Sequence, residues 1–196
     1  MARKEQKKLV ICIAGMTGSG KSTVAKRLAE RYDLRYVSGG NALKSLAVEI
    51  GYSICEKGWW ETEEGMEFLQ QRLGNLEFDK KVDEKLMKEA KEGNVILDSW
   101  TMPWLLKDGF KIWLEANPNV RAKRTTQRDS LSFEKAFARV KEKDEQTKAI
   151  YKKLYGFDLG EDFSLFDFIL DTNKLETAEV FQTICMVIDN ILIKES

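Results

Sequence analysis

The stretch that decides the fold reads Gly15-Met16-Thr17-Gly18-Ser19-Gly20-Lys21-Ser22. It follows the apolar run LVICIA at residues 9–14 and precedes the helix-prone run TVAKRLAE at residues 23–30. In the spacing G-x-x-x-x-G-K-S, glycines allow consecutive backbone N–H groups to turn inward, where they and the N-terminus of the next helix can surround a polyphosphate. The sequence therefore predicts a strand, a phosphate-binding loop and a helix.

This loop indicates a site for a nucleoside triphosphate, and ATP and Mg²⁺ are the predicted cofactors. An ordinary glycine-rich turn is the alternative, but such a turn does not need Lys-Ser at the start of a helix. Lys21 is expected to reach the β- and γ-phosphates, and Ser22 to offer its hydroxyl to Mg²⁺. The residues expected to hold the donor are Gly15, Met16, Thr17, Gly18, Ser19, Gly20, Lys21, Ser22, Thr23 and Asn173.

Composition excludes several classes of function. The 196 residues are 43% hydrophobic, which suits one well-buried domain, and the formal net charge of zero gives no general attraction to nucleic acid or an anionic membrane. The chain has no histidine, which removes histidine bases, triads and metal ligands. No apolar run approaches the ~20 residues of a membrane span, so a cytoplasmic location is expected. The three cysteines form no C-x-x-C pair and are expected to be free, mostly buried thiols: Cys12, Cys55 and Cys185.

Strand-like and helical runs alternate along the chain. Because such alternation implies right-handed crossovers, the sequence predicts an α/β fold with a parallel sheet that binds ligands at the carboxyl ends of its strands. Further strands are expected at residues 34–37, 95–97, 110–114 and 168–170. Helices are expected at residues 41–50, 62–73 and 77–92, and in a stretch that begins at Asn119 and later runs from 133 to 155.

Asp98 ends the apolar strand at residues 95–97, where a phosphate-loop protein holds the waters of Mg²⁺ or an acceptor group. The alternative is a helix N-cap. Arg121, Arg124 and Arg128 have the three- and four-residue spacing of one helix face, which is either solvated or turned toward phosphates. Arg124 and Arg128 are the predicted contacts for ATP and the transition state.

Two further cations and one aromatic residue are candidates. Arg139 and Lys143 lie on a helix of mixed charge, which is either a solvated surface or part of a lid that closes over the phosphates. Trp100 follows Asp98 by two residues, where it either stacks on the acceptor or packs in the core. Thr172-Asn173-Lys174-Leu175 is similar to the guanine-reading N-K-x-D of GTPases but lacks its carboxylate, so Asn173 is expected beside adenine.

The chain resembles the nucleoside monophosphate kinases, and specifically the archaeal-type cytidylate kinases, over essentially all its length. The segments that carry the resemblance are residues 15–22, YVSGG at 36–40, EFDKKVD at 77–83, GNVILD at 93–98, VRAKR at 120–124, QRD at 127–129 and YKKLYGFD at 151–158. The resemblance implies the P-loop fold: three α/β/α layers and a five-stranded parallel sheet in a single domain over 1–196. It also implies an acceptor-binding insertion at about 38–92 and a lid at about 129–157.

The resemblance implies transfer of the ATP γ-phosphate to CMP or dCMP by a monomer or homodimer. Lys21, Arg124, Arg128, Arg139 and Lys143 would act on the phosphates, and Ser22 and Asp98 would serve Mg²⁺. The acceptor would lie against Ser38, Gly39, Asn41, Lys44, Asp98 and Trp100.

Departures from the family pattern fall mainly on the acceptor side. The family often shows G-[DE]-x-[FY]-R where this chain has GNALK at residues 40–44, and arginines where it has Trp100, Lys143 and Ile150. Two alternatives therefore stay open beside a cytidylate kinase. One is a kinase for another nucleotide or a small metabolite, and the other is a nucleotide-binding regulatory ATPase.

Overall fold

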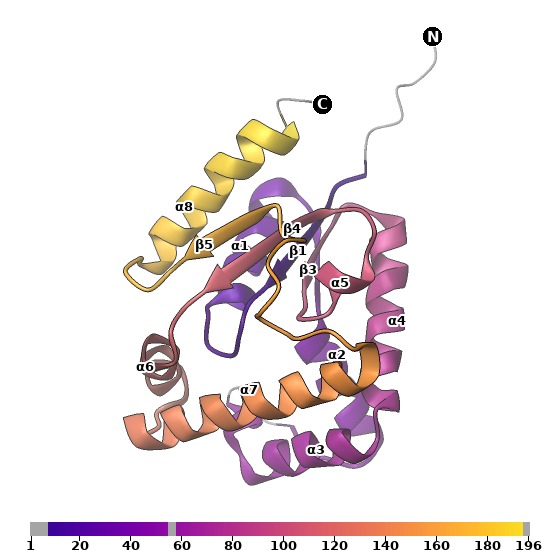
Figure 1. The fold of residues 1–196 in the computed structure, drawn as a ribbon, viewed down its shortest axis with the longest axis vertical. Coiled ribbons are helices and arrows are strands. Elements are labelled where there is room, and N and C mark those ends of the chain that lie inside the picture. The colour runs from indigo at the N-terminus through magenta and orange to yellow at the C-terminus, as the bar shows by residue number, and fades with distance from the viewer. Residues whose placement is uncertain (1–7, 55–57, 194–196) are drawn as a thin grey trace.

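The computed structural model describes residues 8–54 and 58–193 (Figure 1). Five parallel strands form one sheet in the order β2-β3-β1-β4-β5, which confirms the predicted α/β fold with its five-stranded parallel sheet. The strands are β1 (Val10–Ala14), β2 (Arg35–Ser38), β3 (Val95–Asp98), β4 (Phe110–Glu115) and β5 (Phe168–Asp171). The α-helices are α1 (Lys21–Tyr32), α2 (Gly39–Glu49), α3 (Glu63–Gly74), α4 (Glu77–Glu92), α5 (Met102–Leu105), α6 (Pro118–Asp129), α7 (Phe133–Tyr155) and α8 (Thr177–Ile188). Two short helical segments, η1 (Trp59–Glu61) and η2 (Asp189–Ile193), complete the elements.

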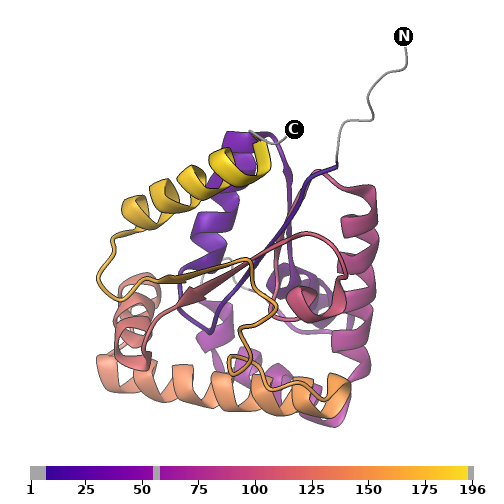
Figure 2. The ribbon, with the colours of Figure 1, turned by 45° about the horizontal axis from the view of Figure 1, so that its top comes forward.

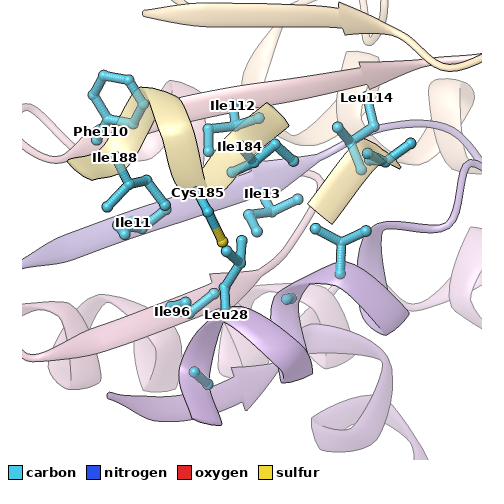
Figure 3. Close-up of a cluster of buried hydrophobic side chains, with 14 residues drawn as sticks. Ile11, Ile13, Leu28, Ile96, Phe110, Ile112, Leu114, Ile184, Cys185 and Ile188 are labelled. Carbon is cyan, nitrogen blue, oxygen red and sulfur yellow. The ribbon is translucent and has the colours of Figure 1, made fainter. Parts of the chain in front are cut away.

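Helices cover both faces of the sheet, so β1 at its centre is apolar on both sides. Ile11 and Ile13 pack into one core cluster with residues of α1, β4 and α8, which Figure 3 shows in close-up. Cys12, between them in the chain, packs into a second cluster with residues of α2, α3 and α4. Figure 2 shows the result, with α1 and α8 on one side of the sheet and α4 on the other.

The strand register brings the carboxyl ends of three strands together. Asp98 on β3 pairs with Ile13 on β1 and with Ser38 on β2. The segment at 15–20 leaves this same edge directly after β1. Helix α7 crosses below the sheet in both views of the ribbon, and its residues Lys143, Thr147 and Tyr151 line a cavity together with residues from this edge. This edge of the sheet is therefore covered by a long helix that belongs to a distant part of the sequence.

Side-chain caps set the starts of two helices slightly earlier than the sequence pattern predicts. Helix α2 begins at Gly39 because the Ser38 hydroxyl accepts a hydrogen bond from the Asn41 amide at 3.3 Å. Helix α6 begins at Pro118 because the Asn117 side chain accepts from the Val120 amide at 3.0 Å. Helix α6 ends where Ser130 adopts a left-handed conformation with φ of 55°.

Cys12 and Cys185 are free and buried, as predicted for thiols, whereas Cys55 lies outside the described residues. None of the helices in the described ranges is long and apolar enough to cross a membrane.

Candidate active site

The loop between β1 and α1 has a backbone that requires glycine. Gly15 and Gly18 have φ of 152° and 80°. A Cβ on Gly15 would lie 2.6 Å from the Leu114 carbonyl oxygen, and one on Gly18 would lie 2.8 Å from that of Arg121. Among the described residues no side chain caps α1 at Gly20, so its first amides suit an anion. This geometry fits the predicted phosphate-binding loop.

Two arginines of α6 brace this loop from behind. Arg121 is buried, and its Nη1 donates to the Thr17 carbonyl at 2.9 Å and pairs with Asp144 of α7 at 2.7 Å. Arg124 donates through Nη1 to the Ser19 carbonyl at 3.2 Å and through Nη2 to the Thr172 carbonyl at 2.7 Å. The two guanidinium groups thereby fix the carbonyls of Thr17 and Ser19 in the loop.

Lys21 lies against the indole of Trp100. Its Nζ is 5.0 Å from the ring centroid, and the Trp100 Nε1–H donates to the Gly15 carbonyl at 2.8 Å. Desolvation lowers the pKa of Lys21, while the carboxylates of Asp98 and Asp144 act in the opposite direction. Trp100 thus contacts both the first residue of the loop and its lysine.

Asp98 and Ser22 have the chemistry that Mg²⁺ prefers. Asp98 is 3% exposed at the end of β3, and its Oδ2 accepts a hydrogen bond from the Tyr36 hydroxyl at 2.9 Å. Thr101 occupies the N-cap position of the helix that follows, so Asp98 is not its N-cap. The described part of the chain holds no group of three or more His, Cys, Asp or Glu side chains suited to a metal. One carboxylate and one hydroxyl fit an ion that takes its other ligands from water and from the nucleotide's phosphates.

One cavity of about 160 Å³ joins these groups to the insertion and to α7. It brings together ten of the residues that the sequence singles out. These are Thr17, Gly18, Lys21, Ser22, Ser38, Gly39, Asp98, Trp100, Arg128 and Lys143. A phosphate loop, a carboxylate and several cations around one cavity can bind phosphate groups and screen their negative charges from one another.

Comparison with known proteins gives a consistent result. A sequence profile of the cytidylate kinase-like family matches residues 10–174. Cytidylate kinase from Pyrococcus horikoshii is 35% identical over 185 residues, covering 94% of this chain and 90% of the relative. Cytidylate kinase from Methanocaldococcus jannaschii is 33% identical over 188 residues, covering 93% and 99%.

The chain belongs to the cytidylate kinase-like family. Among solved structures it is similar to shikimate kinase from Bacteroides thetaiotaomicron, with a TM-score of 0.57 at 14% identity over 94% of this chain and 98% of that one. Shikimate kinase from Acinetobacter baumannii gives a TM-score of 0.55 at 17% identity over 95% and 96%. These likenesses support the three-layer fold of P-loop kinases.

Several predicted residues of this family member lie outside the cavity lining. Arg139 faces Glu142 on its own helix at 3.6 Å. The Asn173 side chain accepts from the Asn117 amide at 2.8 Å and so joins the loops after β4 and β5. The predicted site residues outside the lining are Gly15, Met16, Ser19, Gly20, Thr23, Asn41, Lys44, Arg124, Arg139 and Asn173. The roles of these residues stay predictions, and so do the roles of the ten residues in the lining.

The cavity of this cytidylate kinase-like protein also contains polar residues that sequence reasoning missed. Arg72 and Asp83 line it, although both are almost fully buried. On α4 the buried positions are Asp79, Val82, Asp83 and Leu86, a helical spacing that normally carries only apolar residues. The signal in the sequence that could have revealed these polar residues was the presence of two carboxylates on an otherwise apolar helix face.

Asp83 is held by two hydroxyl groups. Thr101 donates to its Oδ1 at 2.5 Å and Tyr155 to its Oδ2 at 2.7 Å. Burial raises the pKa of Asp83 from an ordinary 3.8 to about 6, although both hydrogen bonds act in the opposite direction. Between these values the native state holds a proton that the unfolded chain has lost, so the stability contributed by this group falls as pH rises toward 6 and levels off above it.

We expect Asp83→Asn to remove this pH dependence. Between pH 4 and 7, the free energy of unfolding of the wild type should fall relative to that of the variant by about 1–3 kcal/mol. Urea unfolding of both proteins at several pH values measures the difference, because all other carboxylates are common to both. Parallel pH profiles would contradict the assignment.

Proposed function

We propose that this protein is a cytidylate kinase, which transfers the γ-phosphate of Mg·ATP to CMP or dCMP. The observation that carries the proposal is the single cavity in which the phosphate loop, Asp98 and the cations Lys21, Arg128 and Lys143 meet residues of the insertion. Membership of the cytidylate kinase-like family, with curated relatives that are cytidylate kinases, supports the same reaction.

Catalysis in this proposal rests on position and charge. The loop amides and Lys21 hold the donor phosphates, and Arg128 and Lys143 meet the charge that spreads over the migrating phosphoryl group. Lys143 is 5% exposed and lies on α7, so this helix both delivers a cation and excludes water. Mg²⁺ bound near Ser22 and Asp98 would neutralise part of the phosphate charge.

The direct test is a coupled assay of ADP release with Mg·ATP. The acceptors are CMP, dCMP, UMP, AMP, GMP and dTMP, and a reaction without acceptor is the control. We expect strong preference for CMP or dCMP. Preference for another acceptor, or turnover that does not depend on any acceptor, would contradict the proposal.

In this proposal the insertion at about 38–92 holds the acceptor and the segment at about 129–157 acts as the lid of one domain. The partners are the two nucleotides alone, handled by a monomer or homodimer in the cytoplasm. No interaction with nucleic acid or membrane is part of the reaction.

Trp100 offers a graded test of how Lys21 is positioned. Trp100→Phe keeps an aromatic face for Lys21 but loses the hydrogen bond to Gly15, so we expect kcat/KM to fall about 5- to 10-fold. Trp100→Ala loses the ring as well and should lower kcat/KM by a further 2- to 10-fold. Steady-state kinetics at saturating and limiting ATP measure both. Equal activity of the two variants would show that the cation–π contact does not contribute to activity.

A further inference from the structure

The hydroxyl group of Tyr36 on β2 reaches the end of the neighbouring strand β3. In the register of the two strands, Tyr36 pairs with Ile96, two residues before Asp98. Side chains two residues apart on a strand share a face, so Tyr36 and Asp98 lie on the same side of the sheet. The two positions are about 6.6 Å apart along the strands. The hydroxyl spans this distance and donates to Asp98 Oδ2 at 2.9 Å.

Helix α1 covers this face of the sheet and brings a second polar group to Tyr36. The Tyr36 ring packs against the core cluster that contains the buried residues of α1, and Lys26 of α1 places its Nζ 5.6 Å from the ring centroid. Ser22 precedes Lys26 by one helical turn. Burial raises the pKa of Tyr36, as does the Asp98 carboxylate, whereas hydrogen bonding with Ser38 and Ser22 acts in the opposite direction. Tyr36 is therefore within reach of both residues predicted to serve Mg²⁺.

Packing explains the ring of Tyr36 but not its hydroxyl, because phenylalanine would fill the same apolar space. The hydroxyl adds direction to Asp98. The last torsion of an aspartate side chain is broad, so a carboxylate without a fixed partner samples many orientations. The hydrogen bond to Oδ2 limits that freedom and determines where Oδ1 lies at the edge of the cavity. Mg²⁺ demands near-ideal octahedral geometry, so the orientation of its ligands affects how tightly it binds.

We propose that Tyr36 is a positioning residue for Mg²⁺, whose hydroxyl orients the Asp98 carboxylate toward the metal of the donor nucleotide, beside the Ser22 hydroxyl. This inference rests on the donor side of the proposed function. It requires no contact between Tyr36 and the nucleotide. A hydroxyl with a structural role alone is the alternative, and its loss would weaken nucleotide binding equally with and without Mg²⁺.

The first experiment measures the affinity for ADP by calorimetry, with Mg²⁺ and with EDTA, in the wild type and in Tyr36→Phe. We expect the ratio of the two affinities to fall about 3- to 10-fold in the variant, while the affinity in EDTA stays within about 2-fold. An unchanged ratio, or an equal loss of affinity under both conditions, would overturn the inference. A wild type whose affinity does not depend on Mg²⁺ would overturn it too.

Tyr32→Phe is the matched control. It removes another tyrosine–aspartate hydrogen bond, of 2.8 Å to Asp189, and Tyr32 does not line the active-site cavity. We expect this variant to keep the wild-type ratio, because it loses the same kind of bond without touching Asp98. A fall in Tyr32→Phe as large as that in Tyr36→Phe would assign the effect to general loosening of the fold and overturn the inference.

The second experiment asks whether Tyr36 acts through Asp98. Asp98→Ala and Asp98→Ala/Tyr36→Phe complete a double-mutant cycle with the same titrations. With no carboxylate left to orient, we expect Tyr36→Phe to change the ratio by less than about 2-fold. A fall as large as in the wild-type background would overturn the inference. Both experiments omit the acceptor, so they decide the role of Tyr36 alone, whereas failure of CMP as an acceptor in the kinetic assay would overturn the proposed function.

Discussion

Lys21→Ala is expected to abolish phosphoryl transfer, with kcat at least about 10³-fold below that of the wild type. Lys21 is the cation at the head of α1, its Nζ lies 5.0 Å from the centroid of the Trp100 ring, and it lines the same cavity as Asp98. In this partly desolvated position a charge acts on phosphate oxygens more strongly than it would in water. The loss therefore falls on the transition state, where negative charge is redistributed.

The measurement is kcat from ADP release with saturating CMP and ATP, together with the melting temperature. Lys85→Ala is the matched control, because Lys85 is an exposed lysine on α4 that does not line the cavity. Lys21 is only half-buried and caps no helix, so the variant should fold. Near-normal turnover in a folded Lys21→Ala protein would remove Lys21 from the mechanism.

The sequence predicted those parts of the site that depend on neighbouring residues. The glycine spacing at 15–20 determines a loop whose backbone few other residues could adopt, and Asp98 follows its strand directly. The five strands could be predicted equally well, because each is a short apolar run between helical patterns. Local pattern and local structure coincide in these elements.

The three arginines of α6 show where such reasoning ends. Their spacing predicts one face and one environment, yet Arg121 is buried against Asp144, Arg124 bonds to Thr172, and Arg128 lines the cavity. The partners of Arg121 and Arg124 come from distant segments that pack against α6, whereas Arg128 also pairs with its neighbour Asp129. Spacing along a helix specifies a direction but not what lies there.

Arg72 was missed for the same reason. Its partners are Asp79 on the next helix and, through that carboxylate, Tyr151, which is 72 residues from Asp79 in the sequence. Trp100 was predicted as a site residue, but its hydrogen bond to Gly15 depends on β1 and β3 lying side by side. Contacts across the sheet and between the insertion and α7 become visible only in the folded chain.

Arg128→Ala is expected to lower kcat by about 10²-fold. Arg128 lines the cavity at the end of α6, and its Nε and Nη2 donate to the carboxylate of Asp129 at 2.8 and 2.5 Å. The Asp129 side chain is 1% exposed, so a buried anion holds the guanidinium in place. The effect should fall on kcat more than on the KM of either nucleotide, because the charge it meets develops in the transition state.

Arg128→Lys separates charge from geometry. A lysine keeps the positive charge but cannot form the two-pronged contact, so we expect kcat between those of the wild type and Arg128→Ala. Lys123→Ala is the control, since Lys123 is exposed on the same helix and does not line the cavity. Loss of Arg128 leaves Asp129 without this partner, so melting temperatures are compared and kcat is measured well below the lower one. A folded Arg128→Ala protein with the wild-type kcat would return this arginine to the solvated face of α6, and the transition-state charge would then rest on Lys21 and Lys143.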